Sequence, residues 1–172
     1  MAIEEQEPIG VANFIIKRAI ENKWAVTNLQ LQKVLFFLQG AFLYKFNTPL
    51  MDGSFSKWDY GPVEQDVYHR YRNNGPMMIE SLAPSGTIFD IKPPKMMQEE
   101  SFSEAENDFF EETLEKLLKI NPWELVKWTH SLPSWRNYER AIKLHDKVDE
   151  YSNEEISEAY KQFEGKINDG TI

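Results

Sequence analysis

The sequence predicts a mainly α-helical protein: a single-domain helical bundle around a buried central helix at about residues 28–46, with a small β-hairpin. The central segment is apolar around most of its circumference, and a helix of that kind must be covered by neighbours on most sides. Elsewhere apolar residues recur at helical spacing, and Pro, Gly and Asn separate the segments. From these segments we expect six or seven helices. The 172 residues suffice for one domain with a sizeable core.

The first expected helix covers residues 8–22, where Pro8 suits a first helical turn. Thr27 or Asn28 is expected to cap the central helix, because both side chains can accept a hydrogen bond from the first backbone N–H groups. Within the central helix, we expect Gly40 to let a neighbouring helix approach closely.

The β element is expected to come from two segments far apart in the chain. Residues 54–58 alternate polar and aromatic types, which favours a short strand. Residues 87–91 form a second candidate strand, and the two would pair as a hairpin that packs on the helices. Gly61 and Pro62 break the first segment, so we expect Pro62 to begin a helix over residues 63–71.

The C-terminal half carries further helix-start signals. Capping boxes beginning at Ser103 and Ser152 each open a helix. Between them, Pro122 starts one helix and Ser134 begins another helical piece. We expect Gly165 to end the last helix.

The predicted organisation is a single domain at residues 8–164, between a flexible acidic leader (residues 1–7) and a frayed tail (residues 165–172). The N-terminus is acidic, where a signal peptide would be basic and then apolar. Polar residues interrupt the longest apolar stretch, so no membrane span is expected. These features and the lack of cysteine favour a cytoplasmic protein.

Composition excludes several kinds of chemistry. The chain is expected to fold, because 41% of its residues are hydrophobic and 13% are aromatic. The absence of cysteine removes disulfides, thiolate nucleophiles and cysteine-ligated zinc. A net charge of −9 disfavours direct binding to nucleic acid, which needs concentrated Lys and Arg, and suits a basic protein partner. No phosphate-binding loop is present, and we expect no cofactor.

Catalytic and metal sites are weakly supported. His69, His130 and His145 are the three histidines, and their spacing does not match a metal-binding pattern. Ser131 neighbours His130, but no strand–turn–helix elbow surrounds it. We therefore predict neither a catalytic residue nor a metal ligand.

One carboxylate pair, Asp59 and Glu64, has the residue types for acid–base catalysis. A structural role is the favoured interpretation. Asp59 is expected to cap the turn by accepting backbone N–H groups, and Glu64 to lie in a first helical turn, where the helix dipole favours a negative charge.

The chain is rich in Trp and Tyr, which are over-represented at protein-binding hot spots. Each of these residues alone is accounted for by core packing, but together they favour a protein-binding face. The set is Trp58, Tyr60, Tyr68, Trp123, Trp128, Trp135 and Tyr138.

Two segments of the chain carry a family resemblance: residues 27–43, which read TNLQLQKVLFFLQGAFL, and residues 55–71, which read FSKWDYGPVEQDVYHRY. They resemble the Panacea domain, a phage-associated family formerly listed as a domain of unknown function. Phe36 stands where that family often has Tyr. The resemblance extends over about residues 8–145. The matching positions are Thr27, Leu31, Gln32, Lys33, Val34, Leu35, Phe36, Phe37, Trp58, Tyr60, Gly61, Pro62, Val63 and Tyr68, followed by Leu125, Thr129, His130 and Trp135.

The resemblance implies a helical domain that acts by protein binding: an antitoxin that neutralises a cognate toxin encoded beside it, often in a prophage or mobile element. The alternatives are a proteolytic adaptor that hands a toxin to a protease, a phage accessory protein, or a small enzyme that uses His130. We expect no membrane partner. The residues expected to contact the partner are Trp58, Asp59, Tyr60, Pro62, His130 and Trp135.

Overall fold

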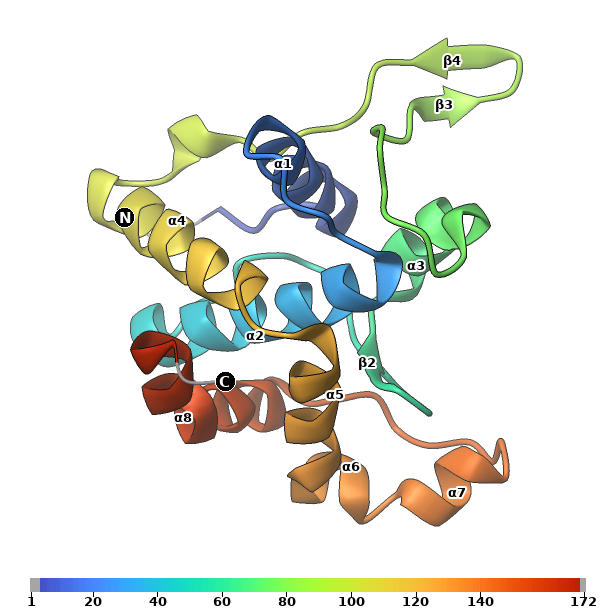
Figure 1. Cartoon of the computed structure of the whole chain (residues 1–172), viewed down its shortest axis with the longest axis vertical. Coiled ribbons are helices and arrows are strands. Elements are labelled where there is room, and N and C mark those ends of the chain that lie inside the picture. Colours follow the sequence, from blue (N-terminus) through green and yellow to red (C-terminus); the bar gives the residue numbers. More distant parts are fainter. Residues whose placement is uncertain (1–3, 171–172) are drawn as a thin grey trace.

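The computed structural model describes residues 4–170 and places helix α2 at the centre of a mainly α-helical protein, as predicted (Figure 1). The elements are α1 (Pro8–Glu21), α2 (Asn28–Phe46), β1 (Ser56–Trp58), β2 (Gly61–Val63), α3 (Gln65–Tyr71), η1 (Arg72–Asn74), β3 (Ser85–Thr87), β4 (Asp90–Lys92), η2 (Glu99–Ser101), α4 (Glu104–Leu118), α5 (Pro122–Ser131), α6 (Pro133–Arg136), α7 (Glu139–Lys143) and α8 (Asn153–Asp169), where η denotes a 3₁₀ helix.

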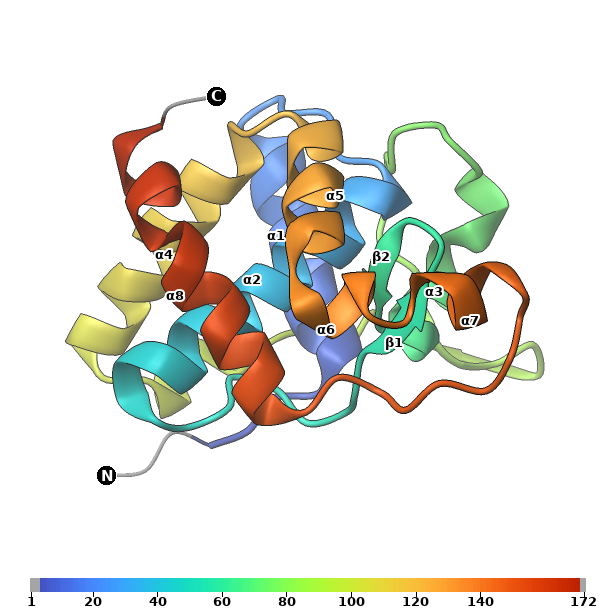
Figure 2. The same cartoon turned by 90° about the horizontal axis from the view of Figure 1, so that it is seen from below.

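Helix α2 is covered on both sides. Helices α1 and α4 lie on one side of it, and α5 and α8 lie across the other, as the two perpendicular views show (Figures 1 and 2). Thr27 caps α2 by accepting a hydrogen bond from the backbone N–H of Gln30, and Asn47 ends it in the left-handed conformation. The predicted bounds of the central helix are thus confirmed, and its side chains from Leu31 to Phe42 are all buried.

Gly40 allows the closest approach to α2. A Cβ atom at this position would lie 2.6 Å from the carbonyl oxygen of Ile156 and 2.9 Å from the Cβ of Tyr160, both on α8. These distances are shorter than side-chain contacts allow, so glycine lets the two helices pack directly. The predicted role of Gly40 is confirmed.

The predicted hairpin pairing is wrong. Residues 54–58 do not pair with residues 87–91, because each segment closes its own antiparallel hairpin. Strand β1 pairs with β2 across a two-residue turn, and β3 pairs with β4 in the same way. A two-residue turn closes at much lower entropic cost than a long-range pairing. The second hairpin projects from the body of the protein (Figure 1).

Pro62 does not begin a helix. It lies in β2, and α3 starts only at Gln65. Glu64 caps α3, because its carboxylate accepts a hydrogen bond of 2.9 Å from the backbone N–H of Val67. Proline is tolerated in this two-stranded ribbon because its missing N–H can face away from the partner strand.

Gly165 does not end the last helix. Helix α8 continues to Asp169, and Gly170 ends it with a φ of 64°. Ile167 is fully buried, so packing beyond Gly165 stabilises the final turns. Residues 165–169 are therefore helical and not frayed.

Several smaller expectations have mixed outcomes. Both predicted capping boxes are present, at the starts of α4 and α8. Within residues 4–170 there are eight α-helices, because the segment after Ser134 divides into α6 and α7. In the predicted leader, residues 1–3 lie outside the described part of the chain. Gln6 is buried and forms an isolated parallel β-bridge with Met51. The domain limits themselves remain a prediction.

Gly40→Ala is expected to lower the free energy of unfolding by about 1–3 kcal/mol, because the new methyl group overlaps α8. The control is Gly165→Ala, where no atom lies within 4 Å of the added Cβ. That change should raise stability by about 0.5–1 kcal/mol through helix propensity alone. Urea unfolding followed by circular dichroism measures both. Equal stability of the two variants would contradict the close packing of α2 on α8.

Candidate functional site

The β1–β2 turn is held from behind by the last turn of α5 and by α6. The Nε2–H of His130 donates to the carbonyl oxygen of Asp59 at 2.8 Å, and the Nε1–H of Trp135 donates to that of Trp58 at 2.8 Å. The two donor rings stack, with centroids 3.9 Å apart. Segments some 70 residues apart in the chain thus form one unit.

Gly61 allows this contact to be tight. Its φ of +96° lies in the region that favours glycine, and an added Cβ would lie 2.5 Å from Oγ1 of Thr129. The same Cβ would lie 3.0 Å from Cε of Lys33. Thr129 is fully buried and donates its hydroxyl to the carbonyl oxygen of Val126. The turn therefore lies wedged between α2 and α5.

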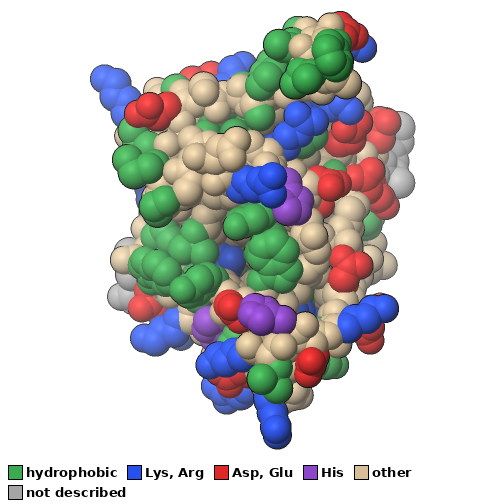
Figure 3. Space-filling model, turned by 90° about the vertical axis from the view of Figure 1, so that its right-hand side faces the viewer, with side chains coloured by type: hydrophobic (Ala, Val, Ile, Leu, Met, Phe, Trp, Pro, Cys, Tyr) green, Lys and Arg blue, Asp and Glu red, His purple; other side chains and the backbone are tan. Residues whose placement is uncertain are grey.

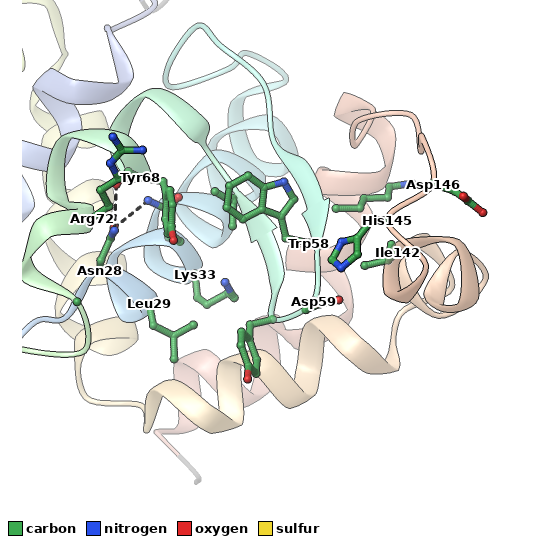
Figure 4. A pocket seen from close by; sticks show the side chains of 15 residues that line it. Asn28, Leu29, Lys33, Trp58, Asp59, Tyr68, Arg72, Ile142, His145 and Asp146 are labelled. Carbon is green, nitrogen blue, oxygen red and sulfur yellow. Dashed lines mark hydrogen bonds between the residues drawn. The ribbon is translucent and has the colours of Figure 1, made fainter.

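A pocket of about 590 Å³ opens beside this turn (Figure 4). Its walls come from α2, the β1–β2 turn, α3, η1 and the segment around α7. The lining combines apolar and polar side chains: Asn28, Leu29, Gln32, Lys33, Lys57, Trp58, Asp59, Tyr60, Val63, Tyr68, Arg72, Gly75, Ile142, His145 and Asp146.

Lys33 is fully buried on α2, and its side chain forms part of the pocket wall between Leu29 and Trp58 (Figure 4). Its Nζ donates to the carbonyl oxygen of Pro62 at 3.1 Å. Within residues 4–170, no carboxylate lies within 4.0 Å of that nitrogen. Burial disfavours the charged form and lowers the pKa of Lys33 to about 7.

The other buried polar groups around the pocket bind within the protein. Gln32 accepts a hydrogen bond of 2.8 Å from the backbone N–H of Glu64, and its amide donates to Asn28. Lys57 forms an ion pair of 3.2 Å with Glu155. These groups hold the walls of the pocket in place.

An exposed aromatic pair lies at the turn, beside the pocket. Tyr60 and Trp123 are each 59% exposed, and their rings meet edge to face at 5.8 Å. Trp58 is half-buried against Tyr68, with ring centroids 4.9 Å apart. Hydrophobic side chains gather in the middle of the face in Figure 3, with charged and histidine side chains above and below them.

The six predicted contact residues lie together but in two layers. Trp58, Asp59 and Tyr60 line the pocket. Pro62 is buried in β2, and behind the turn Trp135 is buried and His130 half-buried. Their predicted contact with a partner stays a prediction. The six residues include neither Lys33 nor Trp123. A lysine within an apolar helix is the sequence signal for the first, and the aromatic set that favours a protein-binding face already contains the second.

The interpretations of single polar residues are resolved by their contacts. His130 binds a backbone carbonyl, and burial lowers the pKa of its imidazole. The Ser131 hydroxyl donates to the carbonyl oxygen of Trp128 and not to His130. The predicted cap by Asp59 is wrong, since no hydrogen bond to its carboxylate is found in the described residues.

Among residues 4–170, no group of three or more His, Asp or Glu side chains is arranged to hold a metal ion. In the same part of the chain, every helix falls short of the length or apolar character that a membrane span requires.

Lys33→Met is expected to change how stability depends on pH. An unfolded lysine keeps its proton up to about pH 10.5, whereas folded Lys33 loses it near pH 7. Between these values the unfolded state binds more protons, so the free energy of unfolding of the wild type rises with pH. The slope should exceed that of Lys33→Met by about 1.4 kcal/mol per pH unit between pH 7.5 and 9.5. Urea unfolding across this range measures it, and parallel curves would refute a buried neutral lysine.

Comparison with known proteins gives two matches. Residues 31–136, more than half of the chain, match the family described as "Antitoxin SocA-like, Panacea domain". Antitoxin SocA of Caulobacter vibrioides (strain NA1000 / CB15N) is 37% identical over 91 residues, which are 50% of this chain and 48% of that protein. No solved structure gives a significant match. The family match, over the region that contains the turn and its supports, shows that this chain belongs to the SocA-like Panacea domain family.

Proposed function

We propose that this protein is an antitoxin that neutralises a cognate toxin by binding it directly at the pocket beside the β1–β2 turn. The observation that carries the proposal is the extent of the family match, residues 31–136. It includes both strands of the turn, α3, α5 and α6. The relative named Antitoxin SocA supports the same role.

The geometry suits a protein interface. Tyr60 and Trp123 offer two large exposed rings next to a pocket, and aromatic anchors beside a desolvated pocket commonly dominate binding energy. The turn that carries Tyr60 is fixed by His130 and Trp135. A fixed turn loses little conformational freedom on binding, so more of the contact energy appears as affinity.

Charge favours a basic toxin. The chain carries a net charge of −9, and Asp59 and Asp146 are exposed at the pocket. Opposite charge on the partner accelerates association, and added salt slows it. We place the encounter in the cytoplasm, where toxin and antitoxin would be made together.

The proposal is tested by co-expression with the neighbouring reading frame. We expect that frame to arrest growth when expressed alone, and growth to recover when this protein is present. A frame that is harmless alone, or equally harmful with this protein, would refute the antitoxin function. Toxin half-life, measured in the same cells, separates the two modes: direct neutralisation leaves it unchanged, and delivery to a protease shortens it.

Tyr60→Ala and Trp123→Ala are each expected to weaken toxin binding at least tenfold, about 1.4 kcal/mol, because each removes an exposed ring of the proposed interface. Calorimetric titration with purified toxin measures the affinities. Stability should change little.

The matched control is Phe89→Ala, which removes a ring that is 93% exposed at the tip of the β3–β4 hairpin. Its affinity should equal that of the wild type. A loss confined to Phe89→Ala would move the interface to the hairpin and overturn the proposed site.

A further inference from the structure

Lys33 has donors that the protein does not use. A lysine ammonium carries three N–H donors, and one of them is directed to the carbonyl oxygen of Pro62. No other hydrogen bond or ion pair of Lys33 is found within residues 4–170. A fully buried cation without a counter-charge is unfavourable, yet this one lines an open pocket.

The neighbouring cations of the pocket are either paired with a carboxylate or exposed to solvent. Lys57 is paired with Glu155, and its Nζ also lies 3.9 Å from the ring centroid of Tyr138. Arg72 is exposed at the edge of the pocket, 3.5 Å from Nδ1 of His69. Lys33 is thus the buried cation of this pocket whose charge no carboxylate of the described residues neutralises.

The walls indicate what accompanies an anion in this space. Leu29, Trp58, Val63, Tyr68 and Ile142 supply apolar and aromatic surface around the pocket. A volume of about 590 Å³ falls in the range of sites that enclose a ligand of many atoms. A small free anion would leave these walls in contact with water, whereas a side chain with an apolar stem would cover them.

We propose that the pocket receives a carboxylate-bearing segment of the bound toxin, with the carboxylate hydrogen-bonded to Nζ of Lys33 and its stem packed between Leu29 and Trp58. This inference rests on the proposed antitoxin function and specifies which chemical group of the toxin is recognised. The acidic exterior selects a basic partner in general, and the buried ammonium of Lys33, which no carboxylate of the described residues neutralises, selects an acidic group at a single point.

Binding is then coupled to proton uptake. A carboxylate beside Lys33 favours its charged form and raises its pKa from about 7. Above pH 7, where free Lys33 is mostly neutral, Lys33 must take up a proton when the complex forms, so the affinity for the toxin falls as pH rises. Other titratable or charged groups face this space from every side: Lys57, Asp59, Tyr68, Arg72, His145 and Asp146 line the pocket, and His130 lies behind the turn. A variant that removes only Lys33 isolates its part.

The first experiment compares the toxin affinity of the wild type, Lys33→Met and the control Lys161→Met at pH 6.5 and 8.5. Lys161 is exposed on α8 and does not line the pocket. We expect Lys33→Met to bind at least tenfold more weakly at pH 6.5 and the control to bind normally. The wild type should lose about tenfold in affinity between the two pH values, and Lys33→Met should lose distinctly less.

The second experiment needs no variant. Carbon-13-labelled lysine allows the pKa of Lys33 to be followed by NMR in the free protein, with acetate and with toxin. The pKa should rise by at least one unit with toxin and stay unchanged with acetate at millimolar concentration. A rise with acetate and none with toxin would assign the pocket to a free carboxylate and overturn the proposal.

The outcomes separate this inference from the proposed function. If the wild type binds toxin and Lys33→Met binds equally well with the same pH dependence, the carboxylate pocket is refuted and the antitoxin function stands. If the wild type does not bind toxin at all, both are refuted.

Discussion

Burial of α2 on every side is the constraint on which the other features depend. Polar side chains of a buried helix must bind within the protein, and those of α2 bind backbone groups of other segments. Gln39 accepts from the N–H groups of Leu50 and Met51 and donates to the carbonyl oxygen of Met51. The chain after α2 is fixed in this way. The same kind of contact is made by Asn28, Gln32 and Lys33.

The three polar residues near the start of α2 build the pocket as a result. Asn28 binds the carbonyl oxygen of Tyr68, Gln32 the N–H of Glu64 and Lys33 the carbonyl oxygen of Pro62. The amides of Asn28 and Gln32 have few hydrogen-bonding groups left to satisfy, whereas the ammonium of Lys33 retains two donors. The contacts that position β2 and α3 therefore also leave one buried cation incompletely compensated, which costs stability in the free protein.

The sequence predicts local features well and non-local ones poorly. The bounds of α2 and both capping boxes follow from residues a few positions apart. The predicted pairing of residues 54–58 with residues 87–91 is wrong because a two-residue turn closes at a lower entropic cost than a pairing with a distant strand. Gly165 is a local stop signal that the burial of Ile167 overrides. Lys33 reads as an interruption of an apolar helix, and its burial depends on α3 and the β1–β2 turn, which sequence spacing does not reveal.

The division of the proposed site into a frame and a surface would let its specificity change without a change of fold. His130 and Trp135 hold the turn through the carbonyl groups of Asp59 and Trp58, not through their side chains. The side chains of Asp59 and Tyr60 are exposed and take no part in that support. Substitutions at these two positions therefore alter the surface offered to a partner while the backbone stays fixed. Gly61 lacks this freedom, because its φ of +96° and its contact with Thr129 exclude a side chain.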